Sequence, residues 1–218
     1  MKKGILFDLD GTLINTWDLY MEAYKLTAQP YIRKPLKEKD IAFLKPSTEM
    51  EFINRLLSSS ETEKDSAYKR FITHYSNLHD RLFKGKYEGI DEMLDRLRGA
   101  GYRLGVITGK SRRAWNVTQR KSELGTFDTV ITDDDVDQSK PHAEGTFKAL
   151  HDLQLDTSEV MYVGDTFTDY KTAKNAAVEF AAALWAKNKE ELEEFKEKTA
   201  GDSTFFHLYE PDDLFDLL

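Results

Sequence analysis

The sequence predicts an α/β protein with a parallel β-sheet core and a helical domain inserted after the first strand. Short apolar runs of strand length alternate with helical segments, as the crossovers of a parallel sheet require. The first apolar run is separated from the others by residues 15–84, whose apolar side chains recur at helical spacing. Polar residues follow the apolar runs directly. The sequence therefore predicts a core domain at 1–14 and 85–218 and an all-helical domain at 15–84.

The expected elements follow in order along the chain. A first strand is expected over residues 4–7, and helices are expected where apolar residues recur over 17–28, 50–57, 68–82 and 90–97. The run Gly99-Ala100-Gly101 ends the last of these helices. Further strands are expected over 104–107, 130–131, 160–163 and 180–185. The tail predicts a short edge strand over 205–208 and a closing helix after Pro211.

Composition narrows the functional class. The chain has 218 residues, of which 40% are hydrophobic, enough for one or two domains. A net charge of -8 argues against a general nucleic-acid binder. The absence of Cys excludes disulfides, thiolate catalysis and zinc held by cysteine. No segment approaches membrane-spanning length. We expect a soluble, cytoplasmic monomer or homodimer that binds neither nucleic acid nor membranes.

The most informative stretch is the run Asp8-Leu9-Asp10-Gly11-Thr12-Leu13, which follows the first strand. Residues two apart in a strand point to the same face, so Asp8 and Asp10 can converge on one point. Two carboxylates held this close favour binding of a cation. Gly11 permits a sharp turn, and Thr12 offers a hydroxyl to stabilise it. The alternative is an ordinary Asp-Gly turn with solvated carboxylates.

Three later strands are also followed by residues suited to phosphate or metal. Thr108-Gly109 offers a hydroxyl and an open backbone N–H, Lys140-Pro141 offers a cation, and Asp165 and Asp169 lie four residues apart at a helix start. Each feature has an ordinary interpretation as a turn, a surface lysine or a helix cap. However, the carboxyl ends of parallel strands meet at one edge of the sheet, so we expect all of them to lie along that edge.

The order and spacing of these four motifs resemble the haloacid dehalogenase superfamily of phosphohydrolases, over nearly the whole chain. The inserted helices resemble the cap of the phosphoglycolate phosphatase and β-phosphoglucomutase-like branch. The resemblance implies a Rossmann-like parallel-sheet core with a small helical cap. It also implies a Mg²⁺-dependent phosphohydrolase that cleaves a small phosphorylated metabolite through an aspartyl-phosphate intermediate.

The same resemblance assigns roles to the motif residues. Asp8 would attack phosphorus, and Asp10 would act as the general acid and base. Mg²⁺ would be held by Asp8, the Asp10 carbonyl and Asp165, with Asp169 binding the metal or orienting a water on it. A final group would hold the phosphoryl oxygens: Thr108, the Gly109 N–H and Lys140.

Several positions depart from the family pattern or bear on the choice of activity. Asn15 replaces a frequent Asp, and Ala143 a frequent Pro. A phosphomutase of this branch would have a His near position 20 and a cap arginine, whereas this chain has Tyr20 and no arginine in the loop 44–49. Hydrolysis is therefore favoured over two alternatives, a sugar phosphomutase and a non-catalytic binding protein that retains the fold. Asp10 argues against dehalogenase activity.

The substrate is expected to be a phosphoglycolate-like or pyrophosphate-like anion. Lys45, in the loop of the helical insert, could contact the leaving group, and Lys110 could add positive charge near the phosphate. The ordinary interpretation of each is a solvated surface cation.

Overall fold

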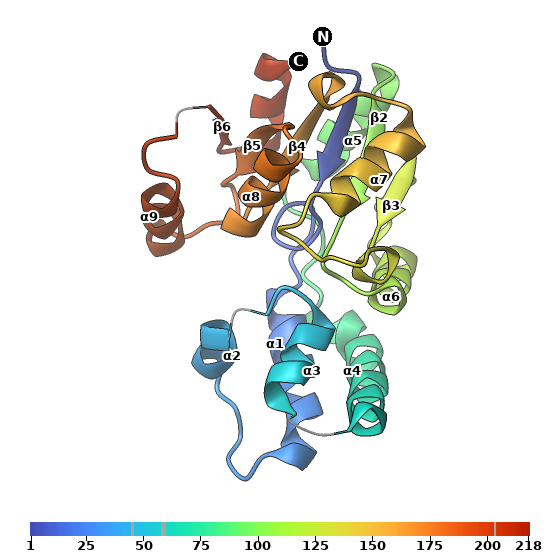
Figure 1. Ribbon diagram of the computed structural model, residues 1–218, viewed down its shortest axis with the longest axis vertical. Coiled ribbons are helices and arrows are strands. Elements are labelled where there is room, and N and C mark those ends of the chain that lie inside the picture. Colours follow the sequence, from blue (N-terminus) through green and yellow to red (C-terminus); the bar gives the residue numbers. More distant parts are fainter. Residues whose placement is uncertain (45, 58–59, 203) are drawn as a thin grey trace. The chain divides into compact units, whose positions relative to one another are not determined.

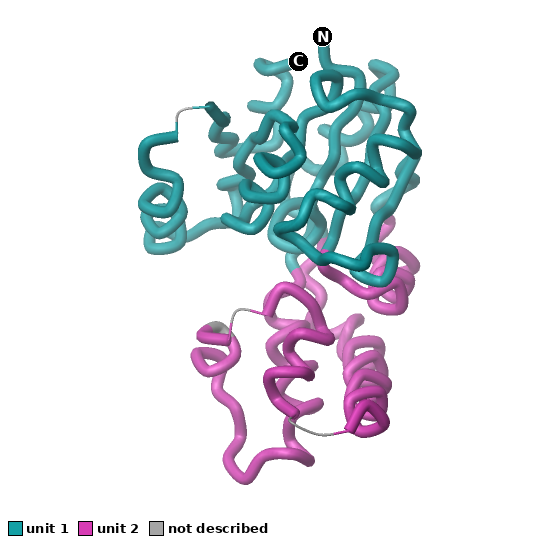
Figure 2. Tube along the Cα trace, viewed as in Figure 1, with its two compact units in different colours: residues 1–15, 86–108, 124–218 teal, residues 16–85, 109–123 magenta. Residues whose placement is uncertain are grey.

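The computed structural model describes residues 1–44, 46–57, 60–202 and 204–218, and these form two compact units. The core unit comprises residues 1–15, 86–108 and 124–218. The helical unit comprises residues 16–85 and 109–123. Neither unit is one continuous stretch of sequence, so the chain passes from one to the other several times (Figure 2).

The core unit contains a six-stranded parallel sheet, which confirms the predicted fold class (Figure 1). The strand order is β3-β2-β1-β4-β5-β6. In the register of this sheet, Phe7 of β1 stands level with Val106 of β2 and Val163 of β4. The strands are β1 (Gly4–Phe7), β2 (Arg103–Ile107), β3 (Thr129–Ile131), β4 (Val160–Gly164), β5 (Glu179–Ala183) and β6 (Phe206–Leu208).

The helices of the core unit are α5 (Ile90–Gly99), α7 (Glu144–Leu153), α8 (Phe167–Asn175) and α9 (Lys189–Lys198). Those of the helical unit are α1 (Trp17–Ala28), α2 (Glu38–Leu44), α3 (Glu49–Leu56), α4 (Glu61–Leu82) and α6 (Arg112–Ser122). The sequence did not predict α2, which has seven residues, or α9, in which Phe195 is the one buried side chain. Both are too short or too polar to show an apolar period. Within the described residues, no helix combines the length and apolar character that a bilayer crossing requires.

Side chains of successive strand residues point to opposite faces of the sheet, and both faces are packed against helices. Leu6, Tyr162 and Phe180 point to one face, where they pack with buried residues of α7 and α8. Ile5 and Phe7 are equally buried and point to the opposite face, which α5 covers (Figure 1). Every residue of β1 is buried, as expected for a strand with neighbours on both edges and helices on both faces.

The strand order creates a switch point beside β1. The chain runs outward from β1 through β2 to β3, then returns to β4 on the other side of β1 and runs outward again to β6. Connections therefore diverge between β1 and β4, which leaves an opening at the carboxyl ends of these two strands. The residues that follow β1 and β4 are the natural place to look for a functional site.

The helical unit has an aromatic core of its own. Tyr24 of α1 stacks on Phe52 of α3 with ring centroids 4.0 Å apart, and Phe71 of α4 lies against Tyr24 at 5.2 Å. Ala114 of α6 is buried in the same cluster. The sequence assigned residues 109–123 to the core domain, whereas the structure groups them with the helical unit because α6 packs against α4.

A buried polar network joins the start of α6 to α1, α3 and α4 within the helical unit. Lys110 is 2% exposed, and its ammonium donates hydrogen bonds to the hydroxyls of Tyr20, at 2.9 Å, and Tyr75, at 3.1 Å. Glu49 accepts hydrogen bonds from the Tyr20 hydroxyl and the Ser111 N–H, both at 2.8 Å. Burial raises the pKa of Glu49 to about 7, against the attraction of Lys110.

His79 of α4 is buried in the helical unit beside Phe83, with ring centroids 4.5 Å apart. Neither ring nitrogen has a hydrogen-bond partner among the described residues. Burial, reinforced by the charges of Lys121 and Lys110, lowers the pKa of His79 to about 4. The neutral ring is therefore the form that the folded helical unit accommodates.

We expect His79→Leu to reduce the acid sensitivity of the fold. The pKa of His79 is lower when folded than the unfolded value of about 6.5, so its contribution is complete above that pH and is lost as pH falls toward 4. The variant should gain about 2 kcal/mol in unfolding free energy relative to wild type between pH 8 and pH 5. Urea titrations at both pH values measure this, with the exposed His151→Leu as control. Equal pH dependence in wild type and His79→Leu would contradict the assignment.

Candidate active site

Three buried carboxylates converge at the carboxyl ends of β1 and β4. Asp8 follows β1, Asp165 follows β4, and Asp169 lies in the first turn of α8. Each offers an oxygen, and these oxygens lie within 4.8 Å of one another. The Asp8 N–H donates to the Val163 carbonyl at 2.8 Å, which continues the ladder of the sheet by one residue. The sequence predicted all three residues, and the structure brings them together.

Lys140 bridges two of these carboxylates. Its ammonium lies 2.6 Å from Asp8 Oδ1 and 2.7 Å from Asp169 Oδ1, and it also donates to the Ile107 carbonyl at 3.3 Å. Burial opposes the charge of Lys140, yet Asp169 and Asp8 together raise its pKa well above the ordinary value. The lysine is therefore charged and fixed beside the carboxylate of Asp8.

Asp169 accepts four hydrogen bonds, which is the full capacity of a carboxylate. One oxygen takes Lys140 and the Tyr162 hydroxyl, the latter at 3.2 Å. The other takes the N–H of Thr166, at 3.0 Å, and the Thr166 hydroxyl, at 2.5 Å. Because Thr166 also accepts from the Asp169 N–H, the two residues form a capping box that starts α8. This arrangement holds Lys140 in place.

The turn after β1 packs directly against Asp165. Gly11 has a φ of +94°, and a Cβ at this position would lie 2.7 Å from Asp165 Oδ2. Only glycine combines this backbone conformation with such a close approach. The Thr12 hydroxyl donates to Asp165 Oδ1 at 3.3 Å, so the hydroxyl that the sequence suggested for the turn also contacts the site.

Sequence reasoning missed Lys187 and its neighbour Trp185. The Lys187 ammonium lies 3.0 Å from Asp165 Oδ2, and the Trp185 indole N–H donates to the Thr12 carbonyl at 3.0 Å. Both residues follow β5, the strand beside β4. The rule that polar residues after parallel strands share one edge could have found Lys187, but the expected strand ran to residue 185, two residues beyond the end of β5.

Two further predicted residues belong to the core unit. Thr108 is buried directly after β2, where its N–H donates to the Ile131 carbonyl at 3.0 Å. Asp10 is half-buried in the turn after β1 and is not one of the three clustered carboxylates. Its proposed role in the metal site rests on its backbone carbonyl and stays a prediction.

The remaining predicted residues lie elsewhere. Gly109 and Lys110 belong to the helical unit, where a Cβ on Gly109 would collide with the Ser47 carbonyl and the Lys110 ammonium is enclosed by two tyrosines. Lys45 lies outside the described residues. The roles of Gly109 in phosphate binding and of Lys110 and Lys45 in specificity stay predictions.

The three carboxylates can hold a divalent metal. Burial raises the pKa of Asp8 well above its ordinary value and raises that of Asp165, although Lys140 and Lys187 respectively oppose these shifts. Anionic oxygens that are crowded and desolvated in this way are stabilised by a hard cation, for which carboxylates are the preferred ligands. The donor set therefore fits Mg²⁺ or a similar ion.

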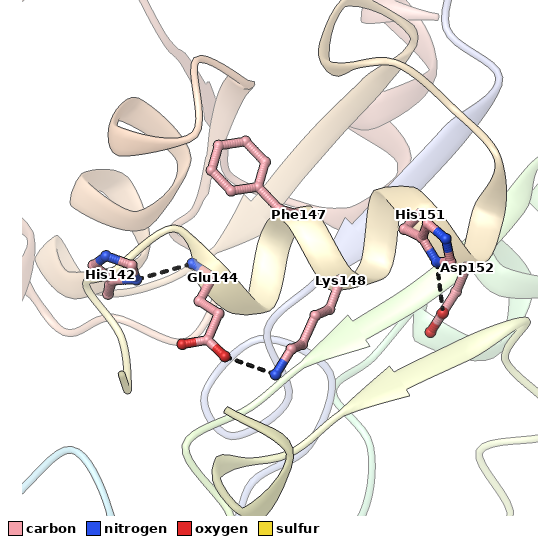
Figure 3. Close-up of a pocket in the computed structure, with 6 residues that line it drawn as sticks. All are labelled: His142, Glu144, Phe147, Lys148, His151 and Asp152. Atoms are coloured by element: carbon pink, nitrogen blue, oxygen red, sulfur yellow. Dashed lines mark hydrogen bonds and ion pairs between the residues drawn. The ribbon is translucent and has the colours of Figure 1, made fainter. Parts of the chain in front are cut away.

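A hollow on the surface of α7 is a different feature (Figure 3). Its charged groups bond to one another, since Lys148 pairs with Glu144 at 2.6 Å and the Glu144 N–H donates to His142 Nδ1 at 3.2 Å. Glu144 also accepts from the Asp137 N–H at 3.1 Å. None of the residues that the sequence singled out for chemistry lines this hollow, so the carboxylate cluster remains the candidate site.

We expect Gly11→Ala to disturb the carboxylate cluster, and Gly101→Ala is the matched control. Both glycines have positive φ, but nothing lies within 4 Å of a Cβ placed at Gly101. The control should lose about 1–2 kcal/mol in unfolding free energy from backbone strain. Gly11→Ala should lose more, about 2–4 kcal/mol, and should also reduce the rise in Tm caused by Mg²⁺, because the methyl displaces Asp165. Urea and thermal unfolding measure both effects. Equal losses in the two variants would refute the close packing.

Comparisons with known proteins agree with this geometry. The family model for haloacid dehalogenase-like hydrolases matches residues 5–183. The chain is 38% identical over 184 residues to a protein of Bacillus velezensis named pyrophosphatase PpaX, covering 84% of this chain and 83% of that one. A protein of the same name from Bacillus thuringiensis is 35% identical over 195 residues, covering 88% of each chain.

Solved structures share the fold at low sequence identity. A putative phosphoglycolate phosphatase from Lactobacillus plantarum has a TM-score of 0.82 at 21% identity, covering all of both chains. CbbY from Rhodobacter sphaeroides, solved with phosphate, has a TM-score of 0.82 at 22% identity, covering 98% of this chain and 96% of that one. By the extent of the family match and the identity to its relatives, the chain belongs to the haloacid dehalogenase-like hydrolase family.

Proposed function

We propose that the protein is a Mg²⁺-dependent phosphohydrolase that cleaves a small phosphorylated metabolite through an aspartyl phosphate on Asp8, with inorganic pyrophosphate as the first candidate substrate. The observation that carries the proposal is the bridge of Lys140 between Asp8 and Asp169, beside the clustered carboxylates. A phosphoryl group that approaches Asp8 meets an ammonium already in place, which reduces the repulsion between two anions.

In the first step, an Asp8 carboxylate oxygen attacks phosphorus, and the bond from phosphorus to the leaving oxygen breaks. Asp10 gives its proton to that leaving oxygen. In the second step, water attacks the phosphorus of the aspartyl phosphate, Asp10 takes a proton from the water, and the Asp8 carboxylate is released. The half-buried position of Asp10 suits a group that exchanges protons with both substrate and solvent.

Mg²⁺ supplies positive charge for the phosphoryl oxygens when it is bound. Asp8 and Asp165 are the better candidates for direct ligands, because the hydrogen-bonding capacity of Asp169 is already filled. We assign Asp169 to positioning Lys140. Thr108 and the Gly109 N–H remain the proposed additional donors to the phosphoryl group.

Pyrophosphate is preferred because relatives at 35–38% identity over most of the chain carry the name pyrophosphatase. A phosphoglycolate-like monoester is the other substrate that the sequence suggested. The phosphomutase alternative is weaker, since Tyr20 replaces the expected His and its hydroxyl is bonded to Glu49 in the interior of the helical unit. A non-catalytic protein would have no reason to retain the bridged carboxylates.

We expect Asp8→Asn to lower kcat for the preferred substrate by at least about a thousandfold, because an amide cannot form the acyl phosphate. Phosphate release from pyrophosphate, phosphoglycolate and aryl phosphate, with Mg²⁺ or with a chelator, measures this and ranks the substrates. Asp137→Asn, an exposed substitution of the same chemistry, is the control. Retained turnover in pure Asp8→Asn protein would exclude the aspartyl phosphate. No turnover of any substrate by wild type would count against the hydrolase proposal.

We expect Lys45→Ala to raise KM for the physiological substrate more than KM for a small aryl phosphate, because a lysine that contacts the leaving group recognises its charge. Steady-state kinetics on both substrates measure the difference. Equal changes in the two KM values would remove Lys45 from substrate recognition. The same two KM values and the Tm are measured for Lys110→Met. Because the Lys110 side chain is buried, this variant is expected to lower Tm as well, which distinguishes a folding defect from a loss of substrate recognition.

A further inference from the structure

Lys187 places a second ammonium in the carboxylate cluster. Its side chain is 12% exposed and lies 3.0 Å from Asp165 Oδ2, and the Asp165 side chain is 11% exposed. Lysines are rarely buried unless they are paired, because a desolvated ammonium is costly. Lys187 is mostly buried and contacts a candidate metal ligand, so its role differs from that of a solvated surface lysine.

The backbone around Lys187 is held by two hydrogen bonds. The Lys187 N–H donates to the Leu184 carbonyl at 3.1 Å, which closes a turn after β5. The Trp185 indole binds the Thr12 carbonyl at 3.0 Å, and the Thr12 hydroxyl in turn contacts Asp165. The loop after β1 and the turn after β5 thus hold the base of the lysine at a set distance from Asp165.

The charges divide unevenly between the two lysines. Lys140 pairs with Asp8 and Asp169, whereas Lys187 is the ammonium that pairs with Asp165 among the described residues. Three carboxylates and two ammonium groups leave a formal charge of −1 on this set of side chains. A divalent cation changes that sum to +1, which favours an incoming phosphate only if both lysines remain nearby. However, a metal that approaches Asp165 Oδ2 from the side where Lys187 lies has to displace the Lys187 ammonium.

We propose that Lys187 and the divalent cation compete for Asp165, and that the ammonium released by the cation binds the second anionic group of the substrate. Lys187 would then have two positions. Without metal it neutralises Asp165, and with metal it becomes the cation that distinguishes a diphosphate from a simple monoester. The second half rests on the proposed function, whereas the competition for Asp165 does not.

The competition is tested by calorimetric titration of the whole protein with Mn²⁺ or Mg²⁺ in the absence of substrate. We expect Lys187→Met to bind the metal about tenfold more tightly, because a nearby positive charge has been removed. Its metal-free Tm should fall by roughly 4–8 °C, because Asp165 is left buried without a counter-charge. Lys148→Met, which removes a surface lysine paired with Glu144, is the matched control. Unchanged or weaker metal binding by Lys187→Met would overturn the proposal.

Two further variants separate this role from general destabilisation. Lys187→Gln keeps a hydrogen-bond donor but removes the charge, so it should also tighten metal binding and serves if Lys187→Met does not fold. In an Asp165→Asn background, Lys187→Met should no longer lower the metal-free Tm, because the pair is already broken. A loss of Tm as large as in the wild-type background would place the effect of Lys187 elsewhere.

The substrate half is tested by KM. Lys187→Met should raise KM for pyrophosphate about tenfold while KM for phenyl phosphate changes little, at metal concentrations that saturate each enzyme. Parallel changes in both KM values would reject the specificity role. If wild type hydrolyses neither of these compounds nor phosphoglycolate, the proposed function fails and the specificity half fails with it, but the titrations still decide the competition for Asp165.

Discussion

The site depends on one electrostatic constraint: three carboxylates are buried together at the edge of a parallel sheet. The fold imposes this, because Asp8 and Asp165 follow adjacent strands whose register brings their ends level. Such a cluster tolerates burial only with cations, and among the described residues Lys140 and Lys187 are the two whose ammonium groups pair with it. Their placement in turn requires the capping box of α8 and the turn after β5.

Most of the core could be predicted because its signals are local. Short apolar runs marked the strands, and the expected first strand over residues 4–7 matches β1 at both ends. The rule that residues after parallel strands share one edge then predicted that Asp8, Asp165, Asp169 and Lys140 lie together. Lys187 was not predicted because the expected strand over 180–185 ran two residues beyond the end of β5. Its contact with Asp165 also depends on the pairing of β5 with β4, which the sequence alone does not show.

Less of the helical unit could be predicted from the sequence. Helices α1, α3 and α4 were expected from their apolar periods, but the sequence did not predict that polar residues of this unit form a buried network. Lys110 was expected to add positive charge near the phosphate, and the structure shows its ammonium bonded to the hydroxyls of Tyr20 and Tyr75, in a network that also includes Glu49. A buried polar network depends on partners from three helices and from the residues just before α6, and no window of sequence contains them all.

The inserted segment 16–85 does not contain the whole helical unit. Residues 109–123 complete it, with Ala114 in its apolar core and Thr118 bonded at 2.8 Å to Tyr75. A fragment cut at residues 16–85 would expose that apolar surface to water, and it would lose Lys110 as a donor to Tyr20 and the Ser111 N–H as a donor to Glu49. Exchange of this unit between related proteins would therefore have to carry α6 with it. Recombination at the apparent boundaries of the insertion would separate halves of one folded body.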